Sequence, residues 1–242
     1  MFNFFKQPEI VFSCEFPEIQ ELYPIEPITT VKRNWFKATG AAYKEEVDRV
    51  GKYLSVSGTA KCPGIHQIVK HGYVLRAWHD LTIRTTDDDY ELSFSIPENM
   101  AGFCQKRGWH KEMIGFFPGD ASRLAVPVPE GSLKTLIKFS TPWCVKVPKG
   151  WSLLIMPVAY GDETRFSSTH GMLPGGEIYQ INPILQINFK NGIEKIDAGT
   201  PLCQLLFIKD EKINVKFKKF DEEFKMGLGL IDFKTSHTYI RN

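Results

Sequence analysis

The residues that could do chemistry do not assemble into a complete catalytic or metal-binding motif. Cys62 and His66 are four apart, which on a helix would place both side chains on one face, and His71 and His79 follow nearby. These side chains could form a zinc site, but they lack the fixed ligand spacing of known zinc motifs. We expect Cys62 to be a small buried hydrophobe and His66 a surface or capping residue. The sequence therefore predicts no metal and no cofactor.

Two further polar stretches lack the partners that catalysis needs. Asp87-Asp88-Asp89 has neither the alternating oxygen ligands nor the closing glutamate of a calcium loop, so we expect it to be a solvated turn. Ser167 to His170 is polar, but no acid partner and no nucleophile-elbow glycines accompany it. No glycine-rich phosphate loop with its lysine is present. The expectation leans away from an enzyme.

Composition limits the classes of partner. With 242 residues and 43% hydrophobic content, the chain can bury one large core. The 30 basic and 28 acidic side chains nearly cancel, so no global field favours nucleic acid, and no stretch is long and apolar enough to suggest a membrane span. The odd number of cysteines at wide spacing indicates reduced thiols, at positions 14, 62, 104, 144 and 203.

The pattern of apolar residues predicts a mainly β protein, an antiparallel β-sandwich or distorted barrel with one or two short helices and long loops. Pro63 fits the first position of a short helix that ends before Gly72. Tyr73 to Thr86 and Tyr90 to Ile96 are expected to form a hairpin. From Lys212 onward, lysines alternate with apolar residues, which favours a strand with its apolar side chains in the core.

We expect a single domain over residues 1–242. Prolines at positions 17, 24 and 27 favour extended chain before a short polar helix at 41–50. The expected parts are an extended, wrapped N-terminal region (1–60), a helix, hairpin and long loop (61–130), barrel-like strands (131–210), and an edge strand with a tail (211–242).

Several segments resemble an uncharacterised family of tailed-phage and bacterial proteins of unknown function. The segments follow the same order and cover most of the chain. They are Phe2 to Lys6, Tyr23-Pro24-Ile25 leading to Trp35-Phe36-Lys37, Cys62-Pro63 followed by Gly72-Tyr73-Val74, and Pro142 to Ser152. The resemblance implies a phage origin, with the protein in the host cytoplasm or in the virion, and implies no particular activity.

The part from Lys146 to Phe207 is more distantly similar to the barrel of dUTPase and dCTP deaminase enzymes. The similar features are Val147 to Gly150 at a Lys-Gly turn, Tyr179 before an apolar strand, and Gly199 to Gln204 in the closing strand. The resemblance implies a nucleotide-binding or nucleotide-hydrolysing barrel as the alternative function. In that alternative, Tyr179 stacks under a sugar or base.

The residues of the enzymatic reaction do not follow the family pattern. Met156-Pro157-Val158 stands where the family has an Arg-Ser pair near the phosphates. The segment from Gly171 to Tyr179 stands where the family has Gly-x-x-Asp before the tyrosine. Glu177 could replace that carboxylate, although it is one methylene longer and differently placed. A fold carries no reaction without its site.

The long loop within 97–130 favours a contact surface. Between Phe103 and Asp120, bulky apolar residues alternate with glycines, which give them little local support. Trp109, Phe116 and Phe117 are therefore the predicted partner-binding residues. The alternative is that these side chains fold onto the core of their own chain. The expected function is that of a non-enzymatic phage protein that binds a phage or host protein, as a virion or assembly component or a host-directed factor, with homo-oligomerisation as one form of binding.

Overall fold

The computed structural model describes residues 8–50, 62–86, 89–95, 114–116, 127–217, 224 and 226–227. The chain forms two compact units. The first comprises Met1–Val31 and Gly72–Asp210, and the second comprises Lys32–His71 and Glu211–Asn242. Each unit is defined by its own packing, so the single domain over residues 1–242 stays a prediction.

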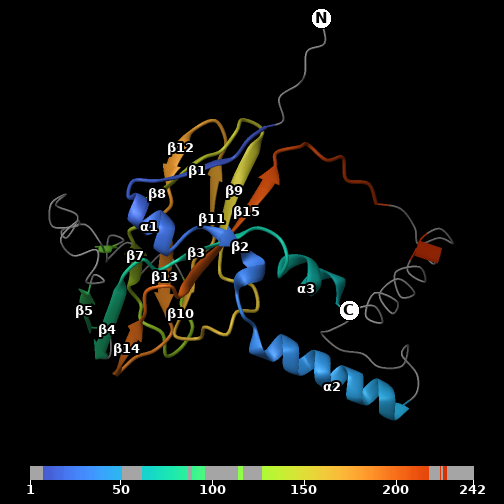
Figure 1. Ribbon diagram of the computed structural model, residues 1–242, viewed down its shortest axis with the longest axis horizontal. Coiled ribbons are helices and arrows are strands. Elements are labelled where there is room, and N and C mark those ends of the chain that lie inside the picture. The colour runs from blue at the N-terminus through green and yellow to red at the C-terminus, as the bar shows by residue number, and fades with distance from the viewer. Residues whose placement is uncertain are drawn as a thin grey trace, which may run out of the picture. The chain divides into compact units, whose positions relative to one another are not determined.

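The first unit contains four β-sheets (Figure 1). Their strand orders are β1 (Val11–Cys14), β8 (Trp143–Lys146), β12 (Ile178–Gln180); β10 (Phe166–Ser168), β13 (Ile184–Ile187), β7 (Leu136–Phe139), β6 (Ile114–Phe116); β11 (Gly171–Pro174), β9 (Trp151–Met156), β15 (Pro201–Lys209), β3 (Tyr73–Arg76), β2 (Glu26–Pro27); and β14 (Gly192–Ile196), β4 (Asp80–Thr86), β5 (Asp89–Ser95). Every described pair is antiparallel, and each sheet has two ends. The predicted fold class, mainly β and antiparallel, is confirmed.

Helices occupy more of the N-terminal region than we expected. In the first unit, α1 spans Pro17–Leu22 and the short 3-10 helix η1 spans Ile28–Thr30. Pro17 stands at the start of α1, where a missing N–H breaks no helical hydrogen bond. In the second unit, α2 spans Asn34–Val50 and not only 41–50, because no proline interrupts it after position 27.

The short helix predicted at Pro63 is present as α3, Pro63–Ile68. Pro63 stands at its start, and Ile65 and Val69 are buried while Ile68 is half-buried. The predicted hairpin is formed by β4 and β5. Asp87 and Asp88, at its expected turn, lie outside the described residues.

The predicted strand from Tyr73 to Thr86 divides into β3 and β4, which belong to different sheets. The division falls at Ala77, whose backbone bonds to the turn formed by residues 197–200. Ala77 N donates to Thr200 O at 2.9 Å, and Ala77 O accepts from Gly199 N at 2.7 Å. Since these groups do not continue a ladder, the chain can pass from one sheet to the next.

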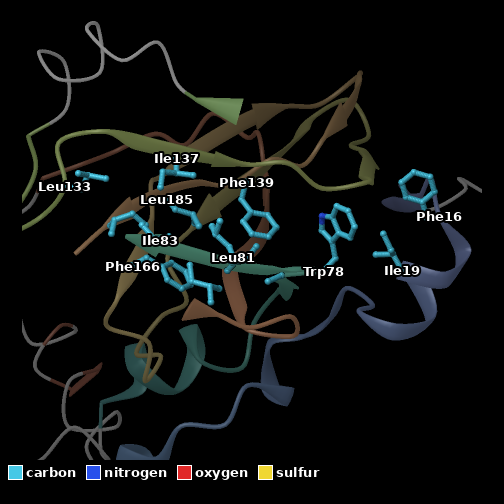
Figure 2. Close-up of a cluster of buried hydrophobic side chains, with 14 residues drawn as sticks. Phe16, Ile19, Trp78, Leu81, Ile83, Leu133, Ile137, Phe139, Phe166 and Leu185 are labelled. Carbon is cyan, nitrogen blue, oxygen red and sulfur yellow. The ribbon is translucent and has the colours of Figure 1, made fainter. Parts of the chain in front are cut away.

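Two large hydrophobic clusters, and a small one of Ile28, Val31 and Val74, stabilise the first unit. The first contains Trp78, Leu81, Ile83, Phe139 and Leu185, and Figure 2 shows it together with Phe16 and Ile19 from the region of α1. The second cluster contains Trp143, Val145, Leu153, Cys203 and Leu205. Both draw on strands far apart in the sequence, which is the non-local packing expected of an antiparallel β protein.

The predicted C-terminal edge strand is wrong for the residues that the structure describes. Residues 211–217 form no strand, and Ile213, Val215 and Phe217 are exposed. Alternation supplies two faces, but a strand also needs a neighbour that accepts and donates backbone hydrogen bonds. No described strand plays that role for this segment.

The predicted loop contacts fall almost entirely outside the described residues. Trp109 and Phe117 are among those undescribed positions. The backbone of Phe116 belongs to β6 and is in register with Ile137 of β7, but its side chain is not described. Their partner-binding role stays a prediction.

Candidate functional site

The connection from β11 to β12 carries Glu177, leads directly to Tyr179 of β12, and is held tightly. A Cβ atom at Gly175 would lie 2.1 Å from Pro148 O and 2.3 Å from Trp151 O, so only glycine fits. Gly176 has a φ of 103° and donates its N–H to Val147 O at 2.8 Å. The connection is therefore fixed against the turn between β8 and β9.

Glu177 lies on this connection and Tyr179 lies on β12, and their environments differ. The Glu177 side chain is exposed. Tyr179 is in register with Val145 of β8, which is in register with Phe12 of β1. These three residues share one face of the sheet, and Tyr179 is half-buried against the second hydrophobic cluster. Their nucleotide-binding role stays a prediction.

The clearest charged cluster surrounds the turn from Asp197 to Thr200. Lys195 Nζ lies 2.7 Å from Asp80 Oδ2 and 2.8 Å from Asp197 Oδ1. Asp80 Oδ1 also accepts a hydrogen bond from Ala198 N at 2.8 Å. Hydrogen bonds to Asp197 and Asp80 raise the pKa of Lys195, and the hydrogen bond from Lys195 lowers the pKa of Asp80. This cluster holds the turn in place.

Arg76 completes the same structural role from β3. Its Nε donates to Glu26 Oε2 at 3.0 Å, its Nη1 to Gly199 O at 3.1 Å, and its Nη2 to Thr30 Oγ1 at 3.1 Å. Arg76 thus joins β2, η1 and the turn at Gly199. The Arg76 guanidinium is thus paired with the Glu26 carboxylate and with the backbone. The pair holds chain segments in position and does not resemble a catalytic acid–base pair.

His79 is a core residue. It is fully buried and stacks on Phe139 with ring centroids 4.5 Å apart. Burial lowers its pKa to about 4. Cys62 is exposed and His66 is half-buried, so the expectation of a buried Cys62 is wrong. Among the described residues, no group of three His, Cys, Asp or Glu side chains is placed to hold a metal ion.

The segment of residues 212–217 is the feature that sequence reasoning placed incorrectly. Its apolar side chains are 82%, 73% and 97% exposed at Ile213, Val215 and Phe217. The polar side chains of Lys212, Asn214 and Lys216 alternate with them. The lysine content of the segment was the available signal, because lysine is common on strand edges that stay uncovered.

Comparison with known families and curated proteins gives no relative. No family model matches the chain. No curated protein matches it either. The resemblance to an uncharacterised phage and bacterial family therefore stays a prediction.

No described helix is long and apolar enough to cross a membrane.

The similar solved structures include dUTPases. The EIAV dUTPase is 12% identical with a TM-score of 0.32, covering 63% of this chain and 85% of its own. A Staphylococcus bacteriophage 80alpha dUTPase structure with dUpNHpp is 11% identical with a TM-score of 0.32, covering 62% and 87%. A dUTPase from phage phi11 of S. aureus is 12% identical with a TM-score of 0.28, covering 45% and 98%. The neighbours are dUTPases at low identity and low TM-score, and no activity follows for this chain.

Proposed function

We propose that the protein is a non-enzymatic phage protein that acts by binding a phage or host protein, as a virion or assembly component or as a host-directed factor. The observation that carries this proposal is the exposure of Ile213, Val215 and Phe217 on one short segment. Full burial of such side chains stabilises by about 1.5–3 kcal/mol each. A partner that covered them would gain much of its affinity there.

The charged groups of the first unit support the same proposal. Three of its ion pairs are Lys195 with Asp80, Arg76 with Glu26, and Arg165 with Glu163. In each pair, the side-chain nitrogen lies no more than 3.0 Å from a carboxylate oxygen. Such groups hold the fold together and do not need a substrate to complete them.

The test is retention of a partner by the full-length chain, tagged at its N-terminus and expressed in host cells with and without phage infection. We expect a phage or host protein to be retained, and to bind the purified chain directly in titration calorimetry. Phe217→Asp should abolish that binding, since it places a charge in the apolar contact. Ile178→Asp is the matched control, because Ile178 is also apolar and 68% exposed but lies on β12.

Two outcomes decide the proposal. If no protein is retained in a Phe217-dependent manner, binding through this segment is wrong. If one is retained, mass spectrometry of purified phage particles separates the roles: presence in particles supports a virion component, and absence supports an assembly or host-directed factor.

A further inference from the structure

We infer that residues 212–217 bind by adding a β-strand to the edge of a partner's sheet, with the apolar side chains covered on one face and the lysines set against acidic side chains of the partner. The inference rests on the proposed function and names its binding mode and partner chemistry. It starts from the fact that all six side chains are exposed.

The order of residues fits a strand and not a helix. In a strand, Ile213, Val215 and Phe217 project to the same face, because side chains alternate with a period of two. In a helix, Ile213 and Phe217 would share a face, but Val215 would point about 200° away, so the three side chains would not form one apolar face. Ile, Val and Phe are also residues enriched in strands. Six residues have the usual length of a strand.

The backbone of the segment is available for pairing. Within the described part of the chain, residues 212–217 belong to no helix or strand and share no backbone hydrogen bond with another segment. Strand addition to an exposed sheet edge supplies such bonds, and side-chain pockets on alternate positions supply specificity. Strand addition by residues 212–217 therefore requires a partner protein whose β-sheet has an unpaired edge strand.

The lysines of the segment indicate that the partner's edge strand carries acidic side chains. In an added strand, Lys212 and Lys216 would lie on the face opposite the apolar side chains, with Asn214 between them. Opposite charges directly across a strand pair stabilise it, and like charges destabilise it. Antiparallel pairing of this segment with itself about Asn214 would set lysine against lysine, which disfavours a second copy of the same segment as the occupant. Nucleic acid would meet the lysines but leave the apolar face in water.

Proline at neighbouring positions tests strand addition. Alternate residues of an added strand direct their N–H groups toward the partner or away from it. Proline removes one N–H and keeps a φ that an edge strand tolerates. We compare Asn214→Pro with Asn214→Ala, and Val215→Pro with Val215→Ala, by titration of the partner identified above. One proline variant should bind about tenfold more weakly than its alanine control, as expected for a lost hydrogen bond. The other should match its control.

Charge reversal tests the acidic edge. Lys216→Glu should weaken binding, and the loss should shrink as salt is raised. Lys149→Glu is the matched control, since Lys149 is exposed on the turn between β8 and β9 and should have no effect. A photo-crosslinking residue placed at Asn214 should link to an edge strand of the partner that carries Asp or Glu.

Each contrary result has a distinct meaning. If a partner binds and Phe217→Asp abolishes binding, but both prolines match their alanine controls, strand addition is wrong and the proposed function stands. If no Phe217-dependent partner exists, both are wrong. Phe217-dependent binding of single-stranded DNA, of anionic vesicles, or of a second copy in light scattering, in place of a protein partner, would overturn the inference.

Discussion

Two segments of this chain have the same alternation of apolar and polar residues, but the apolar side chains are buried in one segment and exposed in the other. In β4, Leu81, Ile83 and Thr85 are buried, while Arg84 and Thr86 between and after them are exposed. In the segment of residues 212–217, apolar side chains alternate just as regularly, and all are exposed. The difference lies in the neighbours: β4 pairs with β14 on one side and β5 on the other.

The comparison shows that alternation specifies two faces but not burial. The β4 backbone is satisfied on both edges, and its apolar face meets the first hydrophobic cluster. The C-terminal segment has neither an adjacent strand nor a facing layer among the described residues. Burial of an apolar face is thus a property of the assembled sheet, and in the C-terminal segment the apolar side chains stay exposed.

The sharpest test of the comparison is truncation of one apolar side chain in each segment. Leu81→Ala should lower the free energy of unfolding by about 2–5 kcal/mol, because it leaves a cavity in the core (Figure 2). Val215→Ala should change it by no more than about 0.5 kcal/mol, since the side chain is in water. Urea denaturation measures both. A comparable loss at Val215 would show that the segment packs on its own protein.

A second test concerns His79, which is buried immediately before β4. The pKa of His79 is lowered by burial from 6.5 to about 4. Below pH 6.5 the unfolded chain binds a proton that the folded chain does not, so stability falls as pH drops from 6.5 toward 4 and levels off below. The full loss is on the order of 3 kcal/mol.

The measurement is urea denaturation between pH 7 and pH 5 for the natural chain and two variants. His79→Gln should remove most of the pH dependence in this window. His170→Gln is the matched control, because His170 is exposed. An unchanged slope in His79→Gln would mean that the ring is not in a dry interior.

A smaller effect is expected at Tyr179, which is only half-buried on its sheet. Tyr179→Ala should cost roughly 1 kcal/mol of stability, in the usual range for single substitutions. The melting temperature should not shift with any deoxynucleoside triphosphate, with or without magnesium. A clear shift with one nucleotide that Tyr179→Ala abolishes would favour the nucleotide-binding alternative by mass action.

The smallest expected effect is that of labelling cysteine thiols. Labelling an exposed thiol should leave the free energy of unfolding unchanged. Cys62 is exposed and should react first with a thiol reagent, whereas Cys203, buried in β15, should react only on unfolding. Burial raises the pKa of Cys203, which further lowers its thiolate fraction. Mass spectrometry gives the order of labelling. Denaturing titration should count five thiols, and three or fewer would show disulfides.

The fold could be predicted where local rules and packing agree. Pro63 marks the start of α3, and the hairpin of β4 and β5 follows from β-branched and aromatic runs around a polar turn. The corner at Ala77 could not be predicted, because it depends on hydrogen bonds to Gly199 and Thr200, more than a hundred residues away. Likewise, only the pairing of β12 with β8 places Tyr179 toward the core, whereas Glu177, two residues earlier, is exposed.

Residue patterns along the chain are enough to predict that this protein is mainly β, that its strands alternate between two faces, and that no complete catalytic motif is present. These follow from local chemistry: strand period, turn residues and ligand spacing. Which alternating segments are covered depends on the packing of distant strands, because burial requires a partner strand and a facing layer. That is why the same pattern forms the core in β4 and an exposed apolar strip at Ile213, Val215 and Phe217.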